Sequence, residues 1–164
     1  MADLARFRIA QDEAGSGFAT ALRELRAERK TSHWIWYIFP QLEGLGRSAR
    51  ARHFGLADVD EAVAYLRDSV LGVRLAEAVA AVHAHVVGPR PVPIETLMGS
   101  EIDALKLVSC LTLFGHVARA GVAGEPRPTW TALAVQAEAI LAAARAQGLP
   151  SCRFTEEACR AAGG

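Results

Sequence analysis

The residues best suited to chemistry lie in one short stretch, Arg29–Ser48, with the sequence RKTSHWIWYIFPQLEGLGRS. Four of the chain's eleven aromatic residues fall within six positions there: Trp34, Trp36, Tyr37 and Phe39. His33 stands beside Ser32 and close to Lys30, at the edge of this aromatic group. An imidazole there could move a proton as a general acid or base, and ligand pockets combine apolar walls with a few polar groups. The stretch therefore predicts either a ligand pocket or, as the alternative, ordinary core packing of these rings.

A second group of polar residues lies in an apolar segment, DALKLVSCLTLFGHV at 103–117. Only two of the eighteen basic residues are lysines, Lys30 and Lys106. Lys106 must reach water or a partner, because an unpaired buried charge is costly. On a helix, one polar stripe would contain Asp103, Lys106, Ser109 and Thr112. The stripe is either one wall of a pocket, in which Asp103 could also move a proton, or a helix edge that touches solvent.

The loop after the aromatic segment has features of an anion site. In GLGRS, Gly44 and Gly46 leave backbone N–H groups accessible, and Arg47 comes just before a helix that begins at Ser48. Backbone N–H groups ahead of a helix favour a bound anion. We include Gln41, which ends the aromatic segment, with these four residues as candidate ligand-binding positions.

Several other kinds of site lack their motifs. The chain has neither a Gly-x-x-x-x-Gly-Lys-Ser/Thr phosphate loop nor a Gly-x-Gly-x-x-Gly dinucleotide motif. His83 and His85 are two residues apart and would face different ways on a helix. Cys152 and Cys159 have no nearby histidine to complete a zinc site. We therefore expect no metal and no cofactor.

Composition favours an ordinary globular protein. The 164 residues predict a single domain, and a formal net charge of zero does not indicate nucleic-acid binding. The sequence contains no run of about eighteen uncharged apolar residues, so we expect no membrane span. Three cysteines without framework spacing favour a reduced, cytoplasmic protein. The oligomeric state is left open.

An all-α fold of about eight helices is expected to position these residues, because apolar residues recur at helical spacing and no strand alternation persists. The candidate helical segments, nine when every short one is counted, span residues 3–14, 18–28, 32–39, 48–54, 58–68, 70–87, 100–120, 129–147 and a last short one from 155. Their expected N-terminal caps are Ser32, Ser48, Asp58, Ser100 and Thr155. Gly148 is the expected stop of the helix that precedes it.

Four segments carry a resemblance to a known family: DLARFRIAQ, ELRAERKTSHWIWYIFPQLEGLG, EAVAYLRDSVLGVRL and the D-x-x-K-L-x-S-x-x-T-L-F pattern at 103–114. Together they resemble the bacterial family catalogued as domain of unknown function 1810, over about residues 3–116. The resemblance implies a compact, mainly helical domain and no established activity. Some members are labelled calpastatin, a disordered inhibitor, which does not match an apolar, helix-rich chain. The chain departs from the family pattern at Cys110, often a serine, and after Gly121, where the usual C-terminal tract is not recognisable.

Two functions fit these residues. The first is a small enzyme that binds a phosphorylated or nucleotide-like molecule, in which the aromatic residues stack on a ring and Lys106 and GLGRS hold an anion. His33 or Asp103 would then move a proton, so the candidate catalytic residues are His33, Asp103 and Lys106. The remaining candidate ligand-binding residues are Lys30, Ser32, Trp34, Trp36, Ser109 and Thr112. The alternative is a non-catalytic binding or protein-interaction module, in which the aromatic segment would be a recognition surface for a protein or nucleotide. The enzyme hypothesis requires His33, Lys106 and a carboxylate to meet at one concave surface.

Overall fold

The computed structural model describes residues 3–164, apart from the side chain of Val122, and within these residues the fold is all-α. Ten helices are present there, against the eight or so expected, and no strand. They are α1 (Ala5–Gln11), α2 (Phe18–Arg26), α3 (Ile35–Ile38), α4 (Ala49–His53), α5 (Val59–Arg67), α6 (Leu71–Val86), α7 (Ile94–Met98), α8 (Glu101–Gly124), α9 (Pro128–Ala146) and α10 (Arg153–Ala162).

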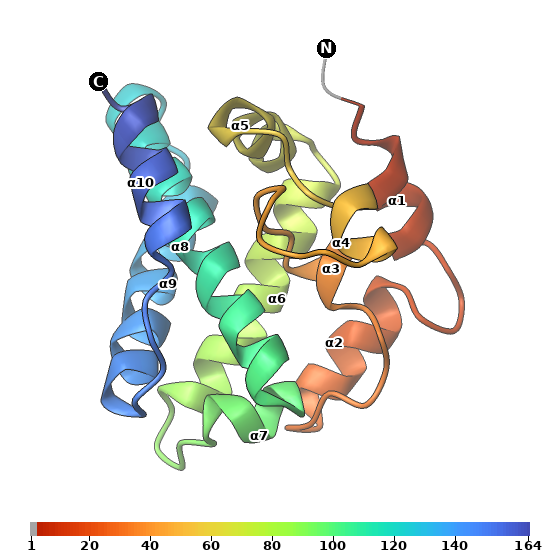
Figure 1. Ribbon diagram of the computed structural model, residues 1–164. Helices are drawn as coiled ribbons and strands as arrows, with labels where there is room; N and C mark the ends of the chain where they lie inside the picture. Colours follow the sequence, from red (N-terminus) through yellow and green to blue (C-terminus); the bar gives the residue numbers. More distant parts are fainter. Residues whose placement is uncertain (1–2) are drawn as a thin grey trace.

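Two long helices, α6 and α8, organise the fold (Figure 1). Helix α8 packs against α9, α10, α5, α7 and α3, while α6 packs against α9, α2 and α5. Figure 1 shows α9 and α10 on one side of α8, and α1 to α4 on the other side of the molecule. Leu107, Leu111 and Phe114 of α8 are fully buried, so the apolar segment singled out in the sequence is the centre of the core.

The caps at three helix starts are confirmed. Ser48, Asp58 and Ser100 each accept a hydrogen bond from the backbone N–H three residues later. This contact satisfies one of the donors that a helix start leaves unpaired. Gly148 follows α9 with a φ of +82°, a conformation that favours glycine, and confirms the expected stop.

Two expected caps are wrong. Helix α3 begins at Ile35 rather than near Ser32, because the hydroxyl of Ser32 donates to the carboxylate of Glu24 instead. Helix α10 begins at Arg153, so Thr155 is inside the helix, where it is fully buried and lies 3.1 Å from the sulfur of Cys152. Ser32 thus has a partner outside the local turn, which a cap rule does not consider, whereas α10 begins two residues earlier than expected and the Thr155 hydroxyl faces Cys152, the residue just before the helix.

A hydrogen bond donated by buried Gln11 fixes the position of α3. The Gln11 amide nitrogen donates to the backbone oxygen of Tyr37 at 2.7 Å and lies 3.0 Å from the hydroxyl of Tyr65. The hydroxyl of Tyr37 in turn donates to the backbone oxygen of Ser16 at 2.7 Å. The short aromatic helix is thus tied to α1 and α5, which compensates for its having only four residues.

The loop between α3 and α4 is held by an isolated parallel bridge between Leu42 and Leu56. The backbone N–H of Leu56 donates to the oxygen of Gln41 at 3.0 Å, and that of Glu43 donates to the oxygen of Leu56 at 2.8 Å. Both leucines are buried. This bridge places α4 next to α3.

No helix in the described part of the chain is by itself long and apolar enough to cross a membrane. Helices α5 and α6 meet that criterion only when taken together, and the chain bends by 92° between them.

Candidate functional site

The segment before α3 is organised around one buried carboxylate, that of Glu24 on α2. It accepts hydrogen bonds from the backbone N–H groups of Thr31 and Ser32 at 3.0 and 3.1 Å and from both of their hydroxyls. The indole N–H of Trp34 donates to the same carboxylate at 2.7 Å. Burial raises the pKa of Glu24, but the hydrogen bonds from Ser32, Trp34 and Thr31 outweigh it and lower the pKa from 4.5 to about 2.

Lys30 connects this segment to α8. Its ammonium group lies 2.7 Å from Asp103 Oδ2, donates to the backbone oxygen of Ser32 at 2.6 Å, and stands 5.0 Å above the ring of Trp34. The side chain of Lys30 is only 7% exposed. Its charge is thus offset within the protein, and its main effect is to join two segments that are more than seventy residues apart.

Lys106 shares the same carboxylate but holds it less closely. Its ammonium group lies 3.7 Å from Asp103 Oδ1, and its side chain is 20% exposed. It also stands 4.7 Å from the centroid of the Trp36 ring. Since Asp103 is closer to Lys30, the charge of Lys106 is only partly offset.

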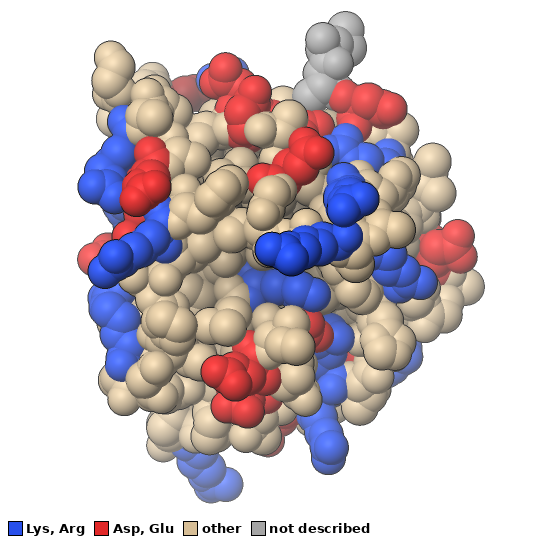
Figure 2. All heavy atoms as spheres, viewed as in Figure 1, with Lys and Arg blue, Asp and Glu red and all other residues tan. Residues whose placement is uncertain are grey.

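The indole of Trp36 lies close to a second cation. The guanidinium carbon of Arg50, on α4, is 5.2 Å from the centroid of the ring. Trp36 is half-buried, and its N–H is shielded from water without a hydrogen-bond partner among the described residues. Figure 2 shows basic side chains gathered in the middle of the face that it presents, over α4 and the loop before it as drawn in Figure 1. Two cations beside the ring, one of which shares the carboxylate of Asp103 with Lys30, make this surface locally positive.

Two adjoining pockets lie beside these residues. The first has a volume of about 370 Å³, and its lining includes Lys30, His33, Trp36 and Asp103. The second has a volume of about 830 Å³, and its lining includes His33, Tyr37, Arg50 and His53. Thr31 and His33 line both, so the exposed side chain of His33 stands where the two pockets meet. Lys106 lines neither pocket, but it lies against two residues that line the first one, Asp103 and Trp36.

The family described as "Protein of unknown function (DUF1810)" matches residues 1–125. The chain belongs to this family. The resemblance carried by the four segments quoted above is thus confirmed, and all residues described so far in this site lie within the matched region. Helices α9 and α10 begin after it.

The DUF1810 chain is also similar to a solved structure, the crystal structure of the conserved hypothetical protein Rv1873 from Mycobacterium tuberculosis. The two are 37% identical, with a TM-score of 0.66, and the similarity covers 82% of this chain and 86% of that chain. The fold is therefore shared over most of both molecules. A search of curated proteins found no match.

The structure brings together only some of the sequence-predicted site residues of this DUF1810 chain. Lys30, His33, Trp36 and Asp103 line the first pocket, and Lys106 lies against the last two of them. Ser32 and Trp34 lie beside them, but both are hydrogen-bonded to Glu24. Ser32 donates through its hydroxyl and its backbone N–H, and the fully buried Trp34 donates through its indole N–H. Their polar side-chain groups are thus bonded to Glu24 and hold residues 31–34 in place.

The polar stripe on α8 does not continue along one pocket. Ser109 is buried and donates to the backbone oxygen of Leu105 at 3.1 Å. Thr112 donates to the backbone oxygen of Val108 at 2.7 Å and lines a different pocket, between α8, α9 and α10. The neighbouring Cys110 is fully buried, and burial raises the pKa of its thiol.

The GLGRS loop of this DUF1810 chain is used mainly to build structure. Gly44 has a φ of +97° and faces the ring of Phe154 on α10, and a side chain at Gly46 would collide with Ala51. Ser48 caps α4, and Arg47 is exposed. Gln41 is half-buried and supports the bridge to Leu56 with its backbone oxygen. These five residues do not line the two pockets.

Sequence reasoning missed Glu24, Arg50 and His53. Glu24 lies on a short amphipathic helix, where an acidic residue is normally exposed, and its partners are seven to ten residues further along. Arg50 and His53 belong to ARARH, a run of basic residues typical of a solvated helix. The short distance in sequence between α4 and the aromatic segment was the one feature that could have indicated Arg50 and His53.

Proposed function

We propose that this protein binds a small anionic molecule, of phosphorylated or nucleotide-like chemistry, in the pocket beside Trp36. The observation that carries the proposal is the charge around that ring. Lys106 and Arg50 both lie within about 5 Å of it, and Lys106 shares the carboxylate of Asp103 with Lys30. An anion placed there would offset charge that Asp103 compensates only in part.

The shape of the site supports a small molecule rather than a protein partner. Volumes of about 370 and 830 Å³ are within the usual range for ligand pockets, about 300–1,000 Å³. Met98 and Ile102 supply apolar surface in the smaller pocket, and Tyr37 and Phe54 do so in the larger one. A phosphate could lie near Lys106 while a flat ring extends along these surfaces.

Within this proposal the three candidate catalytic residues have different roles. Both oxygens of Asp103 face lysines, so we assign it the orientation of Lys106 rather than proton transfer. Lys106 holds the anion as a point charge. His33 lines both pockets and is the side chain suited to moving a proton if the ligand is turned over. His33→Asn separates the two candidate functions, because an enzyme would lose turnover and keep binding.

A thermal-shift comparison tests the proposal. Wild-type protein is screened with inorganic phosphate, ribose 5-phosphate, AMP and related compounds, next to Lys106→Met. Met keeps the apolar stem and removes the charge. A ligand at about 100 times its Kd stabilises the native state by about 2.7 kcal/mol, which is about 5–10 °C in Tm for a chain of this size. We expect such a shift for the wild type and none for Lys106→Met.

Arg47→Gln is the matched control, because Arg47 is exposed and does not line these pockets. It should show the wild-type shift. Equal shifts in wild type and Lys106→Met would place the anion elsewhere, and loss of the shift in Arg47→Gln would point to the GLGRS loop. If no phosphorylated compound shifts the wild type, the proposal is wrong.

A further inference from the structure

A separate pocket lies between α8, α9 and α10, and no residue that lines it belongs to the two pockets above. Its volume is about 340 Å³. Two of its three helices, α9 and α10, follow residue 125, where the family match ends. This pocket is therefore built largely by the part of the chain beyond the family match.

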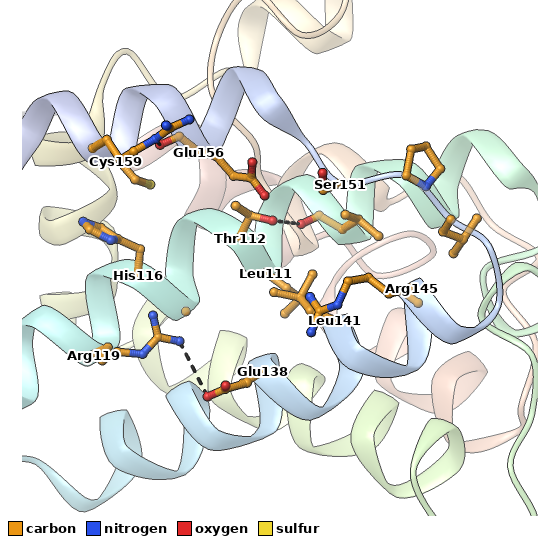
Figure 3. Close-up of a pocket in the computed structure, with 16 residues that line it drawn as sticks. Leu111, Thr112, His116, Arg119, Glu138, Leu141, Arg145, Ser151, Glu156 and Cys159 are labelled. Atoms are coloured by element: carbon orange, nitrogen blue, oxygen red, sulfur yellow. Dashed lines mark hydrogen bonds and ion pairs between the residues drawn. The ribbon is translucent and has the colours of Figure 1, made fainter.

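The floor of the pocket is apolar. Val108 and Leu111 of α8 and Ala144 of α9 are buried, and all three face it. Leu141 and Leu149 are half-buried and complete the surface. Figure 3 shows Leu111 and Leu141 facing each other from α8 and α9, below the α10 side chains. Apolar surface left open in this way favours an apolar group of a ligand.

The rim of the pocket is charged, with a positive excess. Three arginines line it, one from each helix: Arg119, Arg145 and Arg160. Two glutamates line it as well, Glu138 and Glu156. Apart from His116, these five charged groups leave one positive charge uncompensated. A single negative charge on a ligand would balance the rim.

The three arginine side chains differ in the ion pairs and hydrogen bonds that they form within the protein. Arg119 lies 3.9 Å from Glu138, drawn as a dashed line in Figure 3. Arg160 donates to the backbone oxygen of Glu156 at 3.3 Å. For Arg145, no carboxylate of the described residues lies within 4 Å. It follows Leu141 by four positions on α9, so the two side chains are neighbours, and its guanidinium stands at the edge of the apolar floor (Figure 3).

From this arrangement we infer a second binding site, for a small amphipathic anion. Its short apolar tail lies on Leu111, Leu141 and Leu149, and its carboxylate or phosphate head is held by Arg145. A guanidinium binds a carboxylate or a phosphate through two parallel hydrogen bonds. Ligands with either head group would therefore be recognised by the same chemistry. The site is independent of the one beside Trp36, because the two share no lining residue.

Backbone amide NMR on the full chain tests this site with three probes: hexanoate, hexyl phosphate and inorganic phosphate. We expect saturable shifts at the amides of Thr112, Gly115 and Ser151 with both hexyl compounds, and weaker binding of inorganic phosphate, which has no apolar tail. The tighter of the two hexyl compounds identifies the head group. Arg145→Gln should weaken binding by roughly tenfold or more, as expected for a hydrogen bond to a charged group. Arg145 is exposed, so this variant should fold.

Two control variants show whether the loss of binding is specific to Arg145. Arg90→Gln removes an exposed arginine from the loop before α7 and should bind hexanoate as the wild type does. Lys106→Met should also bind it normally, whatever its effect beside Trp36. Unmoved amides at Thr112, Gly115 and Ser151 at about 10 mM probe, a concentration that detects even millimolar affinity, would overturn the inference. So would equal affinity in Arg145→Gln, or inorganic phosphate that binds as tightly as hexyl phosphate.

Discussion

The indole N–H of Trp34 donates to the buried carboxylate of Glu24 at 2.7 Å, whereas the indole N–H of Trp36, two residues later, has no partner among the described residues. The two side chains therefore play different roles in one short segment. Trp34 is part of the scaffold that holds residues 31–34, and Trp36 lies beside the pocket.

This difference predicts opposite sensitivities to loss of the N–H group. Trp34→Phe leaves the Glu24 carboxylate with one hydrogen bond fewer, which costs about 1.5–3 kcal/mol for a bond to a charged group. Trp36→Phe removes a donor that is already unpaired and carries no such cost. Urea unfolding at neutral pH should show Trp34→Phe to be less stable than Trp36→Phe by about that amount. Equal losses would mean that the bond to Glu24 contributes nothing to stability.

Acid should weaken the fold through Glu24. Its pKa is 4.5 ordinarily and about 2 in the folded protein, so between these values the unfolded chain binds the proton more readily. The stability that Glu24 contributes is present in full above pH 4.5 and is lost as the pH falls towards 2. Its size is about 3 kcal/mol, from about 1.4 kcal/mol for each pH unit of difference.

Unfolding curves for Glu24→Gln between pH 2 and 6 check this prediction. The variant should be less stable than the wild type at pH 6, and the difference should shrink by about 3 kcal/mol towards pH 2. Glu157→Gln, at an exposed position on α10, should keep the wild-type dependence on pH. Parallel curves for wild type and Glu24→Gln would show that other carboxylates cause the acid sensitivity.

The two lysines should differ sharply in their effect on stability. Lys30 is 7% exposed and pairs closely with Asp103, so Lys30→Met breaks a buried pair, at a cost of about 3 kcal/mol or more. Lys106→Met should change the stability by less than about 1 kcal/mol, because that side chain is partly exposed and its ion pair is long. Thermal or urea unfolding of both variants measures the difference. Similar losses would place Lys106 in the scaffold rather than at a site.

Local sequence rules predicted the parts of the fold that depend on neighbouring residues. Ser48, Asp58 and Ser100 cap their helices because the partner N–H is three residues away. Helix α7 was not predicted, because its five residues between Pro93 and Gly99 are too few to show a helical period.

The candidate site was predictable only in part, because its contacts span long stretches of chain. Lysine scarcity drew attention to Lys30 and Lys106, but no local pattern indicates that Lys30 pairs with Asp103. The same holds for Arg50, whose contact with Trp36 depends on the bridge between Leu42 and Leu56. The GLGRS motif suggested an anion site, although Ser48 already bonds to an N–H group of the helix that the loop precedes.

The side-chain N–H resonance of Trp36 offers the most direct test of an anion site beside this ring. The chain has three tryptophans, so three indole N–H peaks are expected, and Trp36→Phe assigns the one of interest. On titration with AMP or inorganic phosphate, the Trp36 peak should move saturably while the peaks of Trp34 and Trp130 stay in place, and Lys106→Met should abolish the movement. A Trp36 peak that stays unmoved while a phosphorylated compound stabilises the protein would contradict the account.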